Sequence, residues 1–371
     1  MILQQIDICN FKNIASASLE FSSGVNGLLG YNGMGKSNLL DAIHFMSLCK
    51  SFTGAGEAML IRSGENFSTV RAQYMRRGLE ETLTLGMAAG KRKSLRRQGK
   101  EYARLSEHIG AFPLVMSSPD DIELIRGTAE HRRRLMDMVI AQTDAAYLDA
   151  LIRYTRALQQ RNTLLRDQCA DANLYMAVEA AMDIAAAKIV KARTAWVGEL
   201  TLIINRYYSA IAGAGSENVT LRYASPLAGD GTTLGELLDH NRRHDQVLRH
   251  TSAGPHRDDL EVLQNGLPMR RSASQGQCKT FAIALRLAQY EFLRQANPLV
   301  KPLLLLDDIF DKLDAGRVER IVRLVADTGG FGQIFITDTN RTHLDEIVSN
   351  VSSGGNYSLW NVENGNFQKL H

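Results

Sequence analysis

The sequence predicts an α/β fold in which a mixed sheet with flanking helices is interrupted by an inserted helical lobe. A short apolar segment at 25–29 leads through a glycine-rich loop into a helical segment at 38–50. Two long stretches, 147–168 and 174–211, contain no proline and are rich in Ala, Leu, Ile and Arg, as expected of paired arm helices. A buried strand is expected at 303–306, where leucines precede two acidic residues.

The glycine-rich loop has the spacing of a phosphate-binding loop. It reads G-x-x-x-x-G-K-S, a pattern in which backbone N–H groups and a helix N-terminus surround nucleotide phosphates. We expect Lys36 to reach the β- and γ-phosphates of ATP and to be catalytic, and the Ser37 hydroxyl to ligate Mg²⁺. The predicted nucleotide-binding residues are Gly30, Tyr31, Asn32, Gly33, Met34, Gly35, Lys36 and Ser37.

The apolar run at 303–306 supplies the acids that such a loop needs. We expect Asp307 to support Mg²⁺, and Asp308 to orient and deprotonate the attacking water. The alternative is a buried strand that leaves the sheet into an acidic loop. Lys36 and Asp307 are separated by many more residues than the corresponding lysine and aspartate of a compact kinase. A large segment must therefore separate the two halves of one nucleotide site.

A polar loop, Ser272–Gln277, precedes this strand and leads into a helix expected at 278–294. The Asn265-Gly266 pair before it predicts a hairpin turn. Serine and glycine ahead of a helix are ordinary capping residues. The same arrangement is also suited to binding an anion.

Composition excludes several classes of protein. The formal net charge is only +3, so any nucleic-acid site must be local. The four cysteines lack metal-ligand or disulfide-framework spacing, as expected of a reduced cytosolic chain. No segment approaches the roughly 18 apolar residues of a membrane span, and no signal peptide is recognisable at the N-terminus. We therefore predict a cytoplasmic protein with no membrane partner.

The order of these motifs resembles that of the ABC-type ATPase heads. In that family a Ser-x-Gly-Gln signature loop caps the nucleotide bound to the other subunit, so that ATP joins two heads. The resemblance implies an ABC-type head fold and an ATP-dependent homodimer. It implies that Ser274, Gln275, Gly276 and Gln277 act in trans, and that Leu313 and Asp314 form the D-loop.

Three features depart from that family. Asp311 stands where the D-loop commonly begins with serine. The switch histidine of transporter ATPases is absent after Thr337; Asp338 occupies its neighbourhood, and His343 lies farther on. No Q-loop glutamine is evident, although Met116–Asp121 falls where the family makes its crossing. These departures leave γ-phosphate sensing unassigned and favour slow hydrolysis.

Three further strings narrow the resemblance: ICNFKN at Ile8–Asn13, the stretch Tyr154–Leu165, and GPHRDDL at Gly254–Leu260. Together with the signature loop and the paired acids they resemble the RecF family of bacterial recombination mediator ATPases over nearly the whole chain. We assign His256 and Arg257 no catalytic role, because a polar loop joined by internal ion pairs explains them.

The resemblance implies an ATP-dependent DNA-binding switch in recombinational repair of gapped or stalled replication DNA. It implies slow DNA-dependent ATP hydrolysis, the mediators RecR and RecO as partners, RecA loading downstream, and links to the SOS response. The helical texture of the middle of the chain, with head motifs on either side, predicts three segments, and the resemblance fits them. They are an N-terminal head part at 1–125, a helical arm lobe at 126–250, and a C-terminal head part at 251–371.

Two basic clusters are candidates for DNA contact, which would give affinity without sequence preference. The alternative is a solvated hairpin rim and a helix flank that pair with local acids. Because no aromatic residues interleave with the cations, we expect double-stranded DNA or a single/double-strand junction rather than single-strand threading. The candidates are Lys91, Arg92, Lys93, Arg96, Arg97, Arg132 and Arg133.

Two other functions remain open at this point. One is a soluble ATPase subunit of a transporter, which the helical insert and the GPHRDDL string disfavour. The other is a nucleotide-locked DNA scaffold that never turns over.

Overall fold

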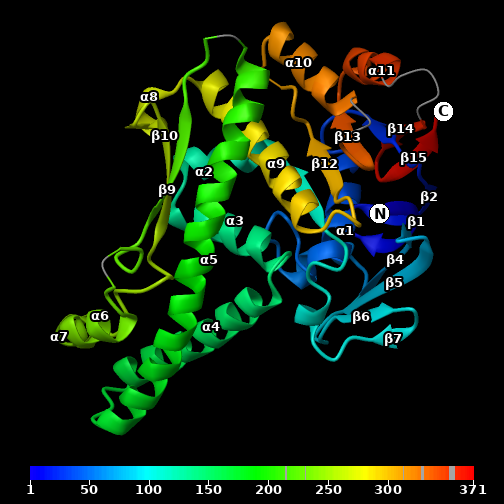
Figure 1. The fold of residues 1–371 in the computed structure, drawn as a ribbon. Coiled ribbons are helices and arrows are strands. Elements are labelled where there is room, and N and C mark those ends of the chain that lie inside the picture. Colours follow the sequence, from blue (N-terminus) through cyan, green and yellow to red (C-terminus); the bar gives the residue numbers. More distant parts are fainter. Residues whose placement is uncertain (214, 230, 312, 327–329, 351–355) are drawn as a thin grey trace. The chain divides into compact units, whose positions relative to one another are not determined.

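The computed structural model of the chain, shown in Figure 1, describes residues 1–213, 215–229, 231–311, 313–326, 330–350 and 356–371. The chain divides into two compact units, the head unit and the helical unit. The head unit comprises Met1–Asp121, Ala210–Gly213 and Lys279–His371, and the helical unit comprises Ile122–Ser209 and Ala214–Cys278. Residues 251–278, which the sequence predicts as part of the head, thus lie in the helical unit.

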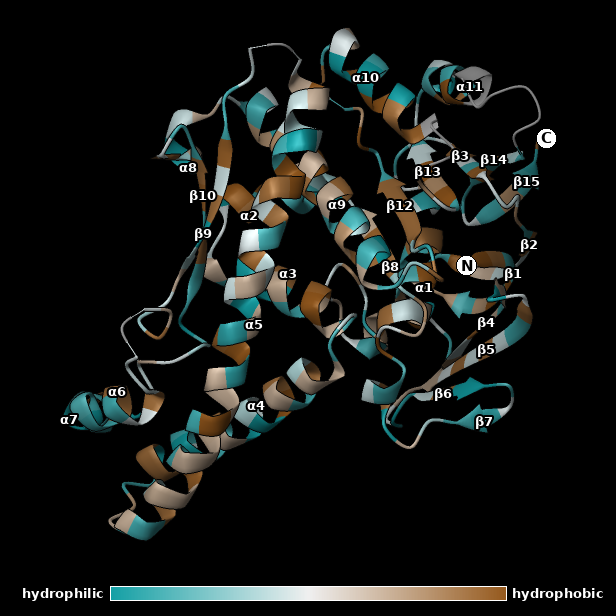
Figure 2. Ribbon diagram, viewed as in Figure 1, coloured by the Kyte–Doolittle hydropathy of each residue, from teal (hydrophilic) through white to brown (hydrophobic). Residues whose placement is uncertain are grey.

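One sheet of the head unit carries the strands predicted around the phosphate-binding loop. Its strand order is β15-β14-β3-β13-β12-β8. Neighbours from β14 to β8 are parallel, and only β15 pairs antiparallel. Figure 2 shows β12 in the brown of apolar residues, as expected for a parallel strand buried on both faces. The strands are β3 (Val25–Leu29), β8 (Leu114–Ser117), β12 (Leu303–Asp307), β13 (Ile334–Asp338), β14 (Tyr357–Glu363) and β15 (Asn366–Lys369).

A second, antiparallel sheet completes the head unit, with the strand order β2-β1-β4-β5-β6-β7. One hydrophobic core joins side chains of this sheet to the parallel sheet and to α1 (Lys36–Leu48), which is almost wholly buried. The core therefore fixes the helix that follows the phosphate-binding loop. The strands are β1 (Ile2–Phe11), β2 (Ile14–Glu20), β4 (Phe67–Arg76), β5 (Leu79–Ala88), β6 (Ser94–Arg97) and β7 (Lys100–Glu101).

The remaining helices of the head unit border this core or follow the acidic strand. They are the short 3-10 turns η1 (Glu57–Met59), η2 (Leu105–Glu107) and η3 (Pro119–Ile122), the last of which ends one residue into the helical unit, together with α10 (Ala315–Ala326) and α11 (Arg341–Asn350). The helix α9 (Gln275–Ala296) begins in the helical unit and continues into the head unit.

The helical unit contains the two long helices expected from the sequence, with slightly shifted ends. They are α4 (Ala145–Arg166) and α5 (Ala172–Ala212), and both are green in Figure 1. The latter is 41 residues long, and its end, from Ala210 on, belongs to the head unit. Asp144 caps α4 by accepting a hydrogen bond from the Tyr147 N–H at 2.9 Å. The shorter helices are α2 (Glu123–Arg126), α3 (Ala129–Ala141), α6 (Leu234–His240), α7 (Arg242–Leu248) and α8 (Met269–Ser272).

A small antiparallel sheet of the order β11-β10-β9 belongs to the same unit. Its strands are β9 (Val219–Ala224), β10 (Asp259–Gln264) and β11 (Leu267–Pro268). Asn265 and Gly266 form the tight turn between β10 and β11, as their sequence predicts.

Internal polar contacts account for the GPHRDDL segment. The His256 Nδ1 atom lies 2.7 Å from the Tyr154 hydroxyl, and Arg193 donates to the Pro255 carbonyl at 2.8 Å. Burial lowers the pKa of His256 to about 4, so its imidazole is neutral near pH 7. Asp258 accepts a hydrogen bond from the Tyr223 hydroxyl. These contacts fix the loop against the helices of its own unit.

No helix among the described residues is both long enough and apolar enough to cross a membrane.

Candidate nucleotide-binding site

The phosphate-binding loop leaves β3 and enters α1 in an open conformation. Gly33 and Gly35 have φ angles of 81° and 113°, in the region that side-chain-bearing residues rarely adopt. A Cβ atom on Gly33 would meet no atom within 4 Å, so the loop faces open space there. Two neighbours hold the loop from behind: Asn38 Nδ2 donates to Asn13 Oδ1 at 2.7 Å, and the Gly365 N–H donates to the Met34 carbonyl at 2.7 Å.

Lys36 lies inside this loop and is only 5% exposed. Its ammonium donates to the Gly30 carbonyl at 2.5 Å and to the Tyr31 carbonyl at 3.0 Å. Burial lowers the pKa of Lys36, while the neighbouring carboxylates Asp308, Asp307 and Asp338 act in the opposite direction. The ammonium is therefore held by backbone oxygens of the loop itself.

Asp307 ends β12 and meets the predicted Mg²⁺ ligand directly. The Ser37 hydroxyl donates to Asp307 Oδ1 at 2.9 Å, and the Thr337 hydroxyl donates to the same oxygen at 2.7 Å. Burial raises the pKa of Asp307, opposed by these two hydrogen bonds. Ser37 and Asp307 bring two hard oxygens side by side, an arrangement that would fit a Mg²⁺ ion with one carboxylate ligand and a shell completed by phosphate and water. The described residues contain no group of three or more His, Cys, Asp or Glu side chains arranged to hold a metal ion.

Asp308 stands at the turn after β12 with a φ of 46°. Its N–H donates to the Thr337 hydroxyl at 3.0 Å, which joins both acids to the next strand. Burial raises the pKa of Asp308, and the negative charges of Asp338 and Asp311 raise it further. A raised pKa strengthens a carboxylate as a proton acceptor, the role predicted for this residue.

Two residues near these acids have contacts that the sequence did not predict. Thr337 bonds both Asp307 and the Asp308 backbone, and the register of the parallel strands, Asp307 opposite Thr337, explains why. Asp338, only 3% exposed, shares a hydrogen bond of 2.7 Å with His343 Nδ1. These contacts could have been predicted from the fact that adjacent parallel strands end at the same edge of a sheet, which brings their last residues together.

The predicted signature loop is a capped helix start. The Ser274 hydroxyl accepts from the Gln277 N–H at 3.2 Å, while Gln277 Oε1 accepts from the Ser274 N–H at 2.7 Å. This reciprocal pair leaves Ser274 and Gln275 exposed. In the predicted D-loop, Asp314 is exposed and caps α10 by accepting from the Arg317 N–H at 2.9 Å, and Leu313 is half-buried.

Comparisons with known proteins identify the family. A model of the RecF/RecN/SMC N-terminal domain matches residues 2–354. A protein from Parabacteroides distasonis named DNA replication and repair protein RecF is 46% identical over 370 residues, covering 100% of both chains. A protein of the same name from Porphyromonas gingivalis is 48% identical over 368 residues, covering 98% of this chain and 99% of the relative. The chain belongs to the RecF family.

Solved structures agree with RecF-family membership. One described as the recombination mediator protein RecF-ATP in the RecFOR pathway matches with a TM-score of 0.88 at 29% identity, covering 100% of this chain and 98% of that chain. An Smc head domain from Pyrococcus furiosus matches with a TM-score of 0.58 at 16% identity and shows likeness of fold alone. The ABC-type ATPase fold predicted from the sequence is therefore confirmed, and the chain takes its place among the RecF DNA replication and repair proteins.

The helix-flank candidates for DNA contact in this RecF-family protein are engaged internally. Arg132 is 6% exposed, and its guanidinium donates to both carboxylate oxygens of Asp259 at 2.6 and 2.9 Å. Arg133 donates to the Asp258 carbonyl at 2.6 Å. Because Arg132 is buried and paired, it is not presented to a DNA backbone. Its partner is a distant acid, Asp259, and not one of the local acids that the alternative interpretation expected.

The candidates around the β6–β7 hairpin divide into two groups. Lys93 pairs with Glu57 at 2.6 Å, and Arg97 pairs with Glu81 at 2.6 Å. Lys91 and Arg92 are exposed and have no ion-pair partner among the described residues. Arg96 is 55% exposed at its side chain and lies 3.7 Å from Glu101. The cations available to phosphate in this cluster are therefore Lys91, Arg92 and Arg96.

Proposed function

We propose that this RecF-family protein is an ATP-dependent DNA-binding switch in recombinational repair. The observation that carries the proposal is the convergence of Ser37 and Asp307, with oxygens 2.9 Å apart, beside the buried ammonium of Lys36. That convergence supplies the parts that a phosphate-binding loop needs for ATP and Mg²⁺. The similar solved structure described as RecF-ATP supports the same ligand.

The proposed work of the site divides among its residues. Lys36 exchanges its two carbonyl partners for phosphate oxygens, since both bonds are made by the same rotatable ammonium. Mg²⁺, when bound, neutralises charge on the phosphates. Asp308 accepts the proton of the attacking water, aided by its raised pKa. With no switch histidine directly after β13, we propose that hydrolysis is slow and depends on DNA.

ATP would act by closing two heads into a homodimer. The exposed Ser274 and Gln275 at the start of α9 are proposed to cap the γ-phosphate held by a partner subunit, with Leu313 and Asp314 at the same interface. To move the dimer from about 1% to about 99% populated, ATP must favour it by about 5.5 kcal/mol. Two nucleotides buried between heads can supply that amount.

The proposed substrate is gapped or stalled replication DNA, bound as duplex or as a single/double-strand junction. Lys91, Arg92 and Arg96 are the proposed phosphate contacts. The similar RecF structure, which is described as belonging to the RecFOR pathway, supports RecR and RecO as partners, with RecA loaded downstream. Action in the cytoplasm, a link to the SOS response, and an arm lobe near residues 126–250 complete the proposal.

Molecular mass and DNA binding, measured together with and without ATP, test this function. The expected result is a monomer without ATP and a DNA-bound dimer with ATP and Mg²⁺. Mass and DNA affinity that do not respond to ATP would contradict the switch. Phosphate release separates a turning-over switch from a nucleotide-locked scaffold, because a scaffold releases none.

A further inference from the structure

The short helix α7 has the reverse of an ordinary amphipathic pattern. Its one buried side chain is a carboxylate, Asp245, which is 0% exposed. Its apolar side chains point outward: Val247 is 81% exposed and Leu248 is 40% exposed. A surface helix normally turns its apolar stripe toward the core. The outward apolar residues of α7 therefore need an explanation other than packing within the chain.

Polar contacts hold α7 in place from its inner side. Asp245 Oδ2 accepts from Arg161 Nη1 at 2.6 Å, and Asp245 Oδ1 accepts from the Ser252 N–H at 2.9 Å. Arg161 is fully buried and also donates to Glu179 at 2.8 Å. Such buried charged hydrogen bonds are costly to desolvate but fix geometry tightly. They present the outer face of α7 in a defined orientation.

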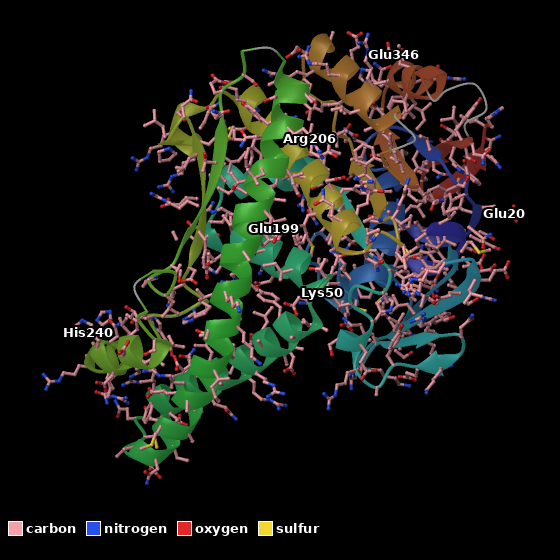
Figure 3. All side chains as sticks on the ribbon, in the orientation of Figure 1. Glu20, Lys50, Glu199, Arg206, His240 and Glu346 are labelled. Carbon is pink, nitrogen blue, oxygen red and sulfur yellow. The ribbon has the colours of Figure 1, made fainter. Side chains whose placement is uncertain are left out.

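Arginine and histidine side chains line that outer face. Arg243, His244 and Arg249 are exposed on or directly after α7, and His240, labelled in Figure 3, is exposed at the end of α6. Neither Arg243 nor Arg249 forms an ion pair with any residue that the structure describes. The nearby acids are already engaged, since Arg242 pairs with Glu179 at 3.0 Å and with Asp239 at 3.4 Å. Figure 2 accordingly shows α7 mostly in the teal of hydrophilic residues.

We propose that this face is a docking surface for an acidic protein segment that carries apolar side chains between its acids. We name it the α7 face and define it by His240, Arg243, His244, Val247, Leu248 and Arg249. The cations attract the acids and speed association, and the two apolar side chains anchor the segment by burial.

Other occupants fit the α7 face less well. A DNA backbone would pair with the arginines but gain nothing from Val247 and Leu248, which carry no polar group. A second copy would bring an identical basic face across a two-fold axis, and like charges would oppose each other. The surface adds a protein partner to the proposed switch, and its residues are separate from the phosphate-binding loop, the paired acids and the signature loop.

The test uses the full chain and a short labelled peptide of alternating Asp and Leu, with binding measured by fluorescence anisotropy. The double substitution Arg243→Glu with Val247→Ser should weaken binding about tenfold or more, because it removes a cation and the most exposed anchor. The matched control is Ile184→Ser with Lys188→Glu on α5, where Ile184 is 67% exposed and Lys188 is exposed in the same unit. The control should bind within about twofold of the original chain.

Four outcomes would overturn the proposal. They are absence of peptide binding to the original chain, equal weakening in the control, equal binding of a peptide with Ser in place of Leu, and an equal loss of duplex-DNA binding in the α7 variant. ATP binding, measured in parallel, should be unchanged in both variants. Loss of ATP binding by the original chain would contradict the proposed switch and leave the α7 face unaffected.

Discussion

Arg286 of α9 forms a two-pronged ion pair with Asp121, which lies just after β8. Its Nε donates to Asp121 Oδ2 at 2.9 Å and its Nη2 donates to Oδ1 at 2.5 Å. Asp121 also accepts from the Ser118 N–H at 3.0 Å. The pair connects two segments of the chain. One is the stretch where the family's Q-loop crossing is expected, and the other is the helix that follows the predicted signature loop. It directly links two segments of the head unit that are far apart in the sequence.

Breaking this pair should destabilise the protein. Asp121→Asn leaves the guanidinium of Arg286, which is 9% exposed, without a counter-charge. We expect the free energy of unfolding in urea to fall by about 3 kcal/mol, as for other buried pairs that lose one partner.

An exposed ion pair provides the control. Arg323 and Glu319 on α10 lie 2.6 Å apart with side chains 70% and 60% exposed. Glu319→Gln should cost less than about 1 kcal/mol. If the free energy of unfolding falls equally in the two variants, the Arg286–Asp121 pair is no stronger than a surface contact.

Lys36→Ala should weaken ATP binding about tenfold to a hundredfold, because it removes a charged donor to phosphate. Isothermal titration with ATP and Mg²⁺ measures the change. Lys50→Ala is the control, since Lys50 is exposed just after the same helix. Unchanged affinity in a folded Lys36→Ala protein would refute the phosphate-binding assignment.

Asp308→Asn should retain ATP and slow phosphate release by about a hundredfold or more, the typical effect of losing a general base. Asparagine is a suitable replacement because it tolerates the positive φ of 46° at this position. If the variant releases phosphate at the original rate, Asp308 is not the proton acceptor.

The same substitution has an expected effect on stability. Because burial and nearby acids raise the pKa of Asp308, the folded state binds a proton there more readily than the unfolded state does. The free-energy cost of holding a negative charge on Asp308 in the folded state is absent at low pH and grows as the pH rises through the raised pKa. Asp308→Asn should therefore stabilise the nucleotide-free protein at pH 7 but not below pH about 3, under the ordinary aspartate value. A stabilisation that is equal at both pH values would contradict the raised pKa.

Local pattern sufficed for much of the fold and the site. The strand at Val25–Leu29, the loop glycines and the leucine strand before Asp307 have strong local signals, and all appear where expected. The pairing of Ser37 with Asp307 also followed, because both motifs belong to one kind of site.

Contacts between distant segments could not be predicted in this way. Arg132 resembles its exposed neighbours in sequence, yet the partner that buries it, Asp259, is far along the chain. Arg286 and Asp121 are likewise partners that lie far apart in the sequence. The reversed pattern of α7 depends on Arg161, whose role no helical periodicity reveals.

Lys91→Glu with Arg92→Glu should weaken duplex-DNA binding and make it less dependent on salt. Removing each phosphate-binding cation should reduce the slope of log affinity against log salt by about 1. Arg71→Glu is the control, since Arg71 is an exposed cation on β4 of the same sheet. A similar weakening in the control would mean that the hairpin has no specific part in DNA binding.

The composite nucleotide site is the central claim, and Ser274→Arg tests it most directly. Ser274 is exposed, and its substitution leaves the bonds of Lys36 and Asp307 intact, so the monomer should bind ATP normally. A bulky cation at the signature loop should nevertheless block ATP-dependent dimerisation and hydrolysis. Mixing this variant with Lys36→Ala should restore part of both activities, because one intact site forms between the two chains. If Ser274→Arg alone dimerises and hydrolyses ATP like the original protein, Ser274 does not complete a partner's site and the proposed mechanism is wrong.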